Sequence, residues 1–186
     1  MITPTLEFGY WNAWILSIPM IIIMIFDMKA TSIRQSGEGE NFQLTRKESL
    51  ISFASLLIMF FSFGYPVFLS LRLGTVWLYV GLVVFLFGSI LTIFAVRDFA
   101  TSPKDKVITK GLYGFSRNPV YIGLILMQTG IGIACVSWLY LLLTIVLLAL
   151  LNSMISSEER FCLYFYGENY QRYLRNTPRW IGLPKS

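Results

Sequence analysis

A run of 32 residues, from Val120 to Leu151, contains no charged side chain. As one helix it would be about 48 Å long, well beyond the hydrocarbon core of a bilayer. As two helices it allows about 16 residues each, near the lower limit for a membrane span. The flanking charges favour two helices over one, because Arg117 precedes the run, Arg160 follows it, and both ends look cytoplasmic. We therefore predict a tight helical hairpin that turns near residues 135–138.

Three further apolar blocks precede this run, at about residues 10–26, 49–70 and 76–96. Hydrophobic residues make up 55% of the 186 residues and charged residues only 13%, which is too apolar for a soluble domain. No lysine or arginine precedes the first block, so we expect no cleavable signal peptide. The sequence predicts an all-α integral membrane protein, a single domain over residues 1–186, with five transmembrane helices and a cytoplasmic helical tail.

Basic residues are distributed unevenly over the six predicted extramembrane segments. In chain order these segments carry 0, 4, 1, 5, 0 and 5 lysines or arginines, so alternate segments hold 14 of the 15. Positive charge is enriched in the cytoplasmic loops of membrane proteins. We therefore expect a multi-pass protein in a lipid bilayer, with the N-terminus outside and the C-terminus in the cytoplasm.

The residue content excludes several kinds of site. The chain has no histidine, which rules out a histidine base, metal ligand or pH switch. Its two cysteines, Cys135 and Cys162, lie at opposite ends of an apolar run without metal-ligand spacing, so we expect neither a metal site nor a disulfide. The net charge of +5 comes from residues beside membrane segments, which argues against nucleic acid as a partner.

The polar connector between the first two apolar blocks spans residues 27–48, with glycine and glutamate alternating at its centre, residues 36–41. It fits a lid over a site or a plain connector, and the plain connector is the commoner use of such a composition.

Glycines inside the later apolar blocks indicate how the helices pack. Gly81 and Gly88 in the third block favour close contact with a neighbouring helix. Gly130 and Gly132 precede the predicted hairpin turn, where we expect them to soften the helix.

The segment from Gly111 to Gly123 joins a polar loop to the long apolar run. Pro119 lacks an N–H group and suits the first turn of a helix. Its ring disfavours helical dihedrals at Asn118, so we expect Asn118 to be the N-cap. The N-terminus of a helix at the membrane boundary is a ready site for an anionic group.

Apolar and aromatic residues recur at helical spacing beyond the long run, which predicts that the fifth helix continues into the tail. Gly167 is expected to break this helix before an interfacial aromatic segment. By residue type alone, Glu158 and Glu159 fit a solvated helix end as well as they fit a site.

Together these motifs resemble the membrane methyltransferase superfamily, which contains the isoprenylcysteine carboxyl methyltransferases and the phospholipid N-methyltransferases. The resemblance covers about residues 101–184, which makes 98–186 the cofactor-binding half, whereas residues 1–97 form three spans without a recognised motif. The segments that carry it are Gly111-Leu112-Tyr113, Arg117-Asn118-Pro119-Val120-Tyr121-Ile122-Gly123, Glu158-Glu159, Tyr166-Gly167-Glu168-Asn169-Tyr170, Tyr173 and Pro178-Arg179-Trp180.

The resemblance implies S-adenosylmethionine as methyl donor, held on the cytoplasmic side between the turn and the paired glutamates. One glutamate would hold the methionine ammonium, and the other would support the loop or pair with Arg117 or Arg160. Many members have histidine where this chain has Asn118, which cannot titrate, so a proton relay at this position is in doubt. The implied cofactor-binding residues are Gly111, Tyr113, Arg117, Asn118, Pro119, Tyr121, Glu158, Glu159 and Tyr170.

The implied reaction is methyl transfer to a lipophilic or small apolar acceptor, which we expect to enter sideways from the bilayer. The acceptor atom, oxygen, nitrogen or sulfur, stays open. The alternatives are a phospholipid N-methyltransferase, an NADPH-dependent reductase of the sterol reductase type, and a non-enzymatic membrane scaffold. Gln128, Arg175 and Arg179 are weak catalytic candidates, for which an interhelical hydrogen bond or contact with lipid phosphates is the simpler interpretation.

Overall fold

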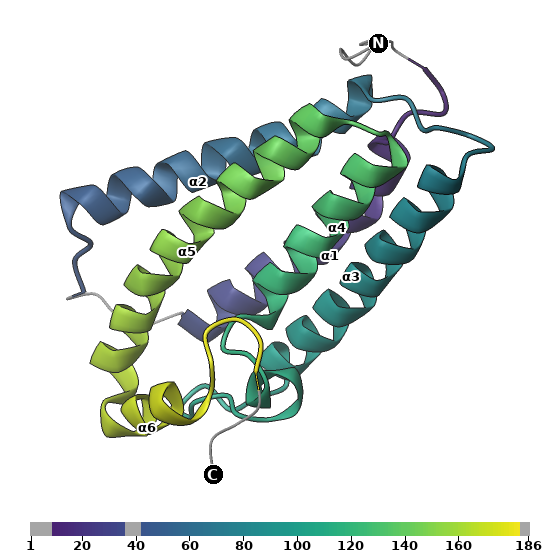
Figure 1. The fold of residues 1–186 in the computed structure, drawn as a ribbon. Helices are drawn as coiled ribbons and strands as arrows, with labels where there is room; N and C mark the ends of the chain where they lie inside the picture. The colour runs from purple at the N-terminus through teal and green to yellow at the C-terminus, as the bar shows by residue number, and fades with distance from the viewer. Residues whose placement is uncertain (1–8, 36–41, 183–186) are drawn as a thin grey trace.

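The computed structural model describes residues 9–35 and 42–182 and is all-helical over them (Figure 1). Four of its helices are long and apolar enough to cross a membrane, and α4 is a shorter apolar helix. The elements are α1 (Trp14–Gln35), α2 (Arg46–Gly64), the 3₁₀ helix η1 (Tyr65–Phe68), α3 (Val76–Ala100), the 3₁₀ helix η2 (Gly111–Gly114), α4 (Pro119–Ala134), α5 (Trp138–Tyr166) and α6 (Glu168–Asn176).

Helices α3 and α4 pack closely because glycines remove side chains from their contact. A Cβ atom added at Gly81 would overlap the backbone of Gly130 and Ala134, and one at Gly88 would overlap the backbone of Gly123. The two helices run antiparallel, so glycines seven residues apart on one meet glycines seven residues apart on the other. The prediction of close packing at Gly81 and Gly88 is confirmed.

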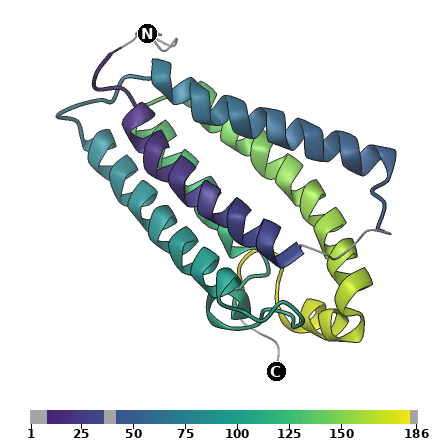
Figure 2. The same ribbon diagram turned by 180° about the vertical axis from the view of Figure 1, so that it is seen from behind.

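Helices α2 and α5 form a second pair, which lies side by side in both ribbon views (Figures 1 and 2). A buried polar network links this pair to α4. The Gln128 side chain, which is fully buried on α4, donates from Nε2 to Ser62 Oγ at 2.8 Å. The Tyr140 hydroxyl of α5 donates to the Ser62 carbonyl at 2.9 Å, and the Thr144 hydroxyl donates to Gln128 Oε1 at 3.5 Å. The simpler interpretation of Gln128, an interhelical hydrogen bond, is therefore observed.

The predicted hairpin is present, and the uncharged run divides at residues 135–137 into α4 and α5. Ser137 caps α5, since its side chain accepts the Tyr140 N–H. Helix α4 runs without a break through Gly130 and Gly132, the glycines that we expect to soften it before the turn. Gly130 instead lies against the backbone of Phe85, and Gly132 lies against Leu141, so close contact explains both glycines.

Several predicted boundaries in the first half were wrong. Helix α1 continues to Gln35, so much of the connector predicted at residues 27–48 is helical, while its centre at 36–41 lies outside the described residues. Helix α2 begins at Arg46, where Thr45 and Glu48 form a capping box. The hydrophobic pattern reveals where a helix is apolar, whereas these two helices extend into polar sequence at their charged ends.

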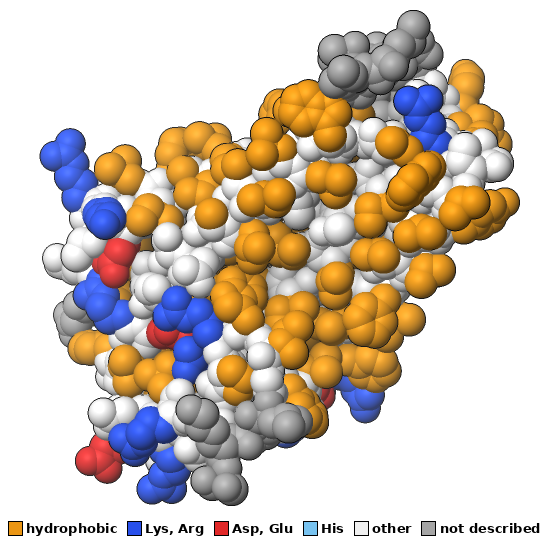
Figure 3. Space-filling view, in the orientation of Figure 1, with side chains coloured by type: hydrophobic (Ala, Val, Ile, Leu, Met, Phe, Trp, Pro, Cys, Tyr) orange, Lys and Arg blue, Asp and Glu red, His pale blue; other side chains and the backbone are white. Residues whose placement is uncertain are grey.

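The space-filling view shows hydrophobic side chains over most of one face, with charged side chains gathered mainly at one end (Figure 3). That end carries α6, η2 and the start of α4, as comparison with Figure 1 shows. This arrangement is typical of a membrane-type helical protein whose candidate site lies at a membrane boundary.

Candidate functional site

The turn before α4 is shaped by Gly111 and a carboxylate from α3. Gly111 has φ +58°, and a Cβ there would also overlap Asp98 Oδ2. The same carboxylate accepts the Leu112 N–H at 3.3 Å. The 3₁₀ helix η2 follows, and its Tyr113 is buried against Phe99. Sequence reasoning identified Gly111 but missed Asp98, although a glycine that opens a motif is a signal that something approaches its backbone closely.

The expected capping by Asn118 is only half right. Asn118 occupies the N-cap position of α4, but its side chain makes no capping hydrogen bond. Its Nδ2 donates instead to the carbonyl of Arg179 at 3.0 Å, and its own N–H donates to Ser116 Oγ at 3.0 Å. The amide is therefore engaged in holding the C-terminal tail, which leaves it no part in satisfying the helix N-terminus.

Glu159 lies at the centre of a three-residue ion network. Arg117 places its guanidinium 2.8 Å from Glu159 Oε1, and both side chains are only 11% exposed. Arg179, from the tail, pairs with Glu159 Oε2. The prediction that one of the two glutamates pairs with Arg117 is confirmed. Because two guanidinium groups share one carboxylate, the network carries a net positive charge.

Glu158 has a different environment from its neighbour. Its Oε1 accepts the Tyr121 hydroxyl at 2.6 Å, and the residue is exposed, whereas Glu159 is buried. Tyr121 also packs on the central core, which α1 reaches through Ile23 and Met24. Adjacent residues lie about 100° apart around a helix. Glu159 therefore faces the ion network, whereas Glu158 faces an accessible position.

The tail is tied to the turn mostly through its backbone carbonyls. Arg117 donates from its N–H to the carbonyl of Pro178 at 3.0 Å and from its guanidinium to that of Leu174 at 2.9 Å. The N–H of Gly182 donates in turn to the carbonyl of Phe115 at 3.2 Å. The turn and the end of α5, remote in sequence, are thus brought together with the tail.

The break at Gly167 is confirmed, and α6 follows it. Two aromatic residues of α6, Tyr170 and Tyr173, are buried against the rest of the protein. The Tyr173 hydroxyl donates to the carbonyl of Tyr113 at 2.7 Å. Burial raises the pKa of both phenols, so they stay protonated and act as packing groups and hydrogen-bond donors.

Among the weak candidates, Gln128 belongs to the polar network described above, and Arg175 is exposed in the last turn of α6. Arg179 does join the ion network. A further contact was missed from the sequence, since Arg160 forms a salt bridge with Glu48 and lies over the ring of Phe42 at 4.7 Å. Neither residue type nor spacing signals this pairing across more than 100 residues.

Comparison with known families decides what this assembly belongs to. The model of the phospholipid methyltransferase family matches residues 74–169, which is just over half of the chain. The chain belongs to the phospholipid methyltransferase family. The match runs from the start of α3 to the start of α6, so it contains the turn, the hairpin and both glutamates of the site.

A second comparison finds similarity over a shorter stretch, to a methyltransferase with a different description. The protein-S-isoprenylcysteine O-methyltransferase of Schizosaccharomyces pombe is 28% identical over 78 residues, which are 41% of this chain and 33% of the relative. The aligned stretch thus spans about a third of the relative's length. The family match places the chain among the phospholipid methyltransferases, as the resemblance of its motifs predicted, and the second comparison adds a distant similarity to an isoprenylcysteine O-methyltransferase.

Three buried polar atoms in the ion network or next to it in sequence make no hydrogen bond in the described part of the chain. They are Nε of Arg117, Oγ of Ser157 and Oε1 of Glu159, the last of which is in ion-pair contact with Arg117. A buried donor without a partner costs about 1–3 kcal/mol, and a bound polar ligand removes that cost. An accessible carboxylate, a guanidinium with a free donor and a hydroxyl fit the ammonium and carboxylate of an amino-acid moiety.

Proposed function

We propose that this protein transfers a methyl group from S-adenosylmethionine to a lipophilic or small apolar acceptor at the membrane–cytoplasm boundary. One observation carries the proposal: the two halves of the motif pattern meet, through Arg117 with Glu159 and Tyr121 with Glu158. Membership of a methyltransferase family supports the reaction type.

We assign the two glutamates different tasks. The accessible carboxylate of Glu158 would hold the ammonium of the donor, with its orientation set by the Tyr121 hydroxyl. The free Nε of Arg117 would bind the donor carboxylate. Glu159 would act as a positioning residue, because it fixes the guanidinium groups of Arg117 and Arg179.

The remaining residues of the predicted set have supporting tasks in this proposal. Gly111 allows the tight approach of Asp98, Tyr113 anchors the turn through its carbonyl, and Pro119 starts α4. Asn118 secures the tail. Tyr170 closes the site from α6, where it packs against Tyr166 and Tyr173.

The donor, when bound, supplies an electrophilic methyl group on a sulfonium. The chain's own task is then to align the acceptor and exclude water, which the buried turn and tail favour. A carboxylate or thiolate acceptor needs no base, which suits a chain without histidine. We propose an acceptor of the isoprenylcysteine type, and the family match keeps a phospholipid amine as the second candidate.

Calorimetric titration of the full-length protein in detergent tests the donor site. Glu158→Gln removes the charge but keeps an acceptor for the Tyr121 hydroxyl, and we expect affinity for S-adenosylmethionine to fall at least about tenfold. The matched control is Glu168→Gln, at an exposed carboxylate on α6, which should bind like wild type. Unchanged affinity in Glu158→Gln would refute the assignment.

A second titration separates the classes of function. Binding of NADPH in place of S-adenosylmethionine would indicate the reductase, and binding of neither would indicate a scaffold. With donor binding established, assays with a farnesylcysteine carboxylate and with phosphatidylethanolamine identify the acceptor class. Methylation of the amine alone would overturn the isoprenylcysteine proposal.

A further inference from the structure

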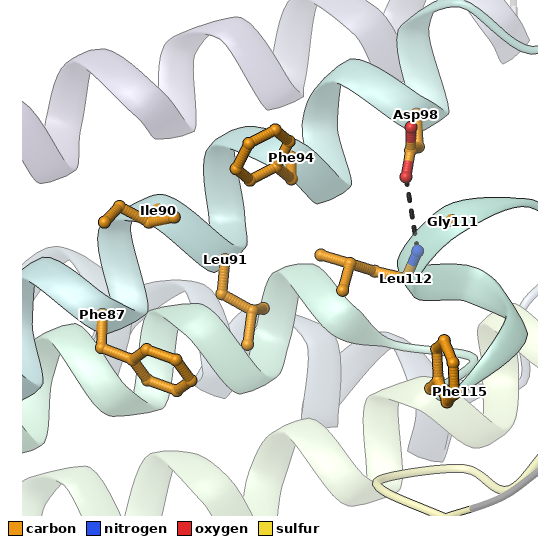
Figure 4. A pocket seen from close by; sticks show the side chains of 8 residues that line it. All are labelled: Phe87, Ile90, Leu91, Phe94, Asp98, Gly111, Leu112 and Phe115. Atoms are coloured by element: carbon orange, nitrogen blue, oxygen red, sulfur yellow. Dashed lines mark hydrogen bonds between the residues drawn. The ribbon is translucent and has the colours of Figure 1, made fainter.

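Each half of the candidate site is supported by a neighbouring helix. The turn before α4 is held from α3, where the Asp98 carboxylate accepts the Leu112 N–H at 3.3 Å (Figure 4). The other half is the stretch of α5 that carries both glutamates, and the next residue on that helix, Arg160, binds the start of α2. The contact from α2 is therefore a candidate for the support of the glutamates.

Arg160 grips Glu48 with two nitrogen atoms. Its Nε donates to Glu48 Oε1 at 3.1 Å, and its Nη2 donates to Glu48 Oε2 at 2.5 Å. The same Nη2 donates to the carbonyl of Gln43 at 3.2 Å, and the guanidinium lies 4.7 Å from the centre of the Phe42 ring. Phe42 in turn meets Phe161 of α5 edge-on, with the ring centres 5.2 Å apart. These contacts, which we call the Arg160 clasp, fasten residues 42–48 onto the end of α5.

Glu48 is itself fixed on α2. Its Oε2 accepts the Thr45 N–H at 2.7 Å and the Thr45 hydroxyl at 2.8 Å, and the Thr45 side chain accepts the Glu48 N–H. This reciprocal capping box holds the carboxylate in one place at the helix N-terminus. Glu48 is therefore a rigid anchor, and α5 is the element whose orientation the clasp sets.

The clasp completes a set of three contacts around one stretch of α5. Successive helical residues point about 100° apart, so residues 158, 159 and 160 face three directions. Glu158 meets Tyr121 on α4, Glu159 meets Arg117, and Arg160 meets α2. Contacts on three sides fix the rotation of α5 about its own axis, and this rotation decides where the Glu158 carboxylate points.

The exposure of the clasp favours orientation over stability as its task. The Arg160 side chain is 45% exposed and that of Glu48 is 21% exposed. Ion pairs that water reaches contribute little to the stability of a fold. A two-pronged contact between a guanidinium and a carboxylate nevertheless constrains geometry closely.

We propose that Arg160 is a positioning residue for the methyl donor. The clasp fixes the rotation of α5 so that Glu158 faces the donor ammonium, and Arg160 itself touches neither donor nor acceptor. This inference rests on the proposed function, in which Glu158 holds that ammonium.

Calorimetric titration of the full-length protein in detergent with S-adenosylmethionine tests the clasp. Arg160→Gln removes the cation, and Glu48→Gln removes the anion but keeps an acceptor for Thr45, because glutamine also serves in capping boxes. We expect each variant to weaken donor affinity about fivefold. The double variant should also lose about fivefold, because all three break the same contact. Arg172→Gln, at an exposed cation on α6, is the matched control and should bind like wild type.

A second readout separates positioning from folding. Melting temperatures of the clasp variants should stay within about 2 °C of wild type, because the ion pair is partly exposed. In the same titrations, a loss of folded protein would lower the binding stoichiometry, whereas misplacement of Glu158 lowers the affinity of the folded molecules.

The outcomes distinguish this inference from the proposed function. Wild-type affinity in Arg160→Gln, beside clear donor binding by the wild type, would overturn the inference alone. A loss in Arg160→Gln without one in Glu48→Gln would overturn it too, since Arg160 would then act without its anchor. Losses that multiply to about 25-fold in the double variant would show two independent effects and would also refute the clasp. A wild type that binds no donor would overturn the proposed function, and this inference with it.

Discussion

Two neighbouring glutamates illustrate how position within one helical turn determines chemistry. Glu158 and Glu159 are indistinguishable by residue type, and the sequence left open which of them would meet a ligand. The structure separates them, since Glu159 is buried between two guanidinium groups and Glu158 is accessible beside a phenol. Their roles in stability and in binding should therefore separate as well.

Glu159→Gln should lower the melting temperature markedly. The substitution leaves Arg117 and Arg179 without their shared carboxylate, and an unpaired buried charge costs about 3 kcal/mol. Glu158→Gln should leave the melting temperature within about 2 °C of wild type, because the residue is exposed. Thermal melts of the two variants in the same detergent check this, and equal losses of stability would contradict the division of roles.

Gly111→Ala should disrupt the turn before α4. The residue has positive φ, and the added methyl group would overlap Asp98, so we expect a loss of about 2 kcal/mol or more. Gly64→Ala is the matched control, since nothing lies within 4 Å of its Cβ position and the backbone there is helical. That variant should be neutral or more stable by up to about 1 kcal/mol. Denaturant titration compares the two.

At the scale of the elements, the bundle contains two unlike helix pairs, with α1 packed mainly against α3. Glycines bring the backbones of α3 and α4 into contact, whereas α5 is joined to α2 and α4 by buried polar side chains. Hydrocarbon tails are as apolar as the helices, so packing and hydrogen bonds drive helix association in membranes. The first pair should therefore be weakened by substitution of a glycine, and the second by loss of a buried hydrogen bond.

Gly81→Ala should separate α3 from α4. Its Cβ would overlap backbone atoms of α4, which cannot move aside as a flexible side chain can, and we expect a loss of about 2 kcal/mol. Unfolding in detergent measures it. A stability as little changed as that expected for Gly64→Ala would mean that the two helices adjust freely.

Gln128→Leu tests whether the mid-helix amide belongs to the architecture or to an acceptor tunnel. Loss of its bonds to Ser62 and Thr144 should cost about 1 kcal/mol of stability. Affinity for S-adenosylmethionine and turnover of any acceptor should be unchanged, because the network lies away from the ion pairs. A selective rise in KM for the acceptor would instead place Gln128 in its path.

For the whole molecule, the charge distribution predicts an orientation that cysteine labelling can check. With Cys135 and Cys162 replaced by serine, a cysteine at Lys106 should react with an impermeant maleimide only after the membrane is opened. A cysteine at Leu73, an exposed position in the segment with one basic residue, should react in intact cells. The reverse labelling pattern would place the candidate site on the outer side of the membrane.

The hairpin and the close helix packing could be predicted from local patterns of charge and glycine, whereas the meeting of the turn with the glutamates was predicted from the family resemblance of the motifs. It did not reveal the length of α1, whose last turns are polar. Nor did it reveal Asp98 beneath Gly111 or the pairing of Arg160 with Glu48. Such contacts depend on how helices distant in the chain are arranged, which no local periodicity records.

The bonds between the tail and the turn have a consequence for recognising this architecture elsewhere. The tail offers mainly main-chain oxygens, those of Leu174, Pro178 and Arg179, to donors on residues 116–118. Every residue carries a main-chain oxygen, whatever its side chain. Substitutions in the tail therefore preserve these hydrogen bonds to the turn. The family match ends at residue 169, before most of this segment. Divergent homologues are therefore best sought by the course of their backbone together with their sequence motifs.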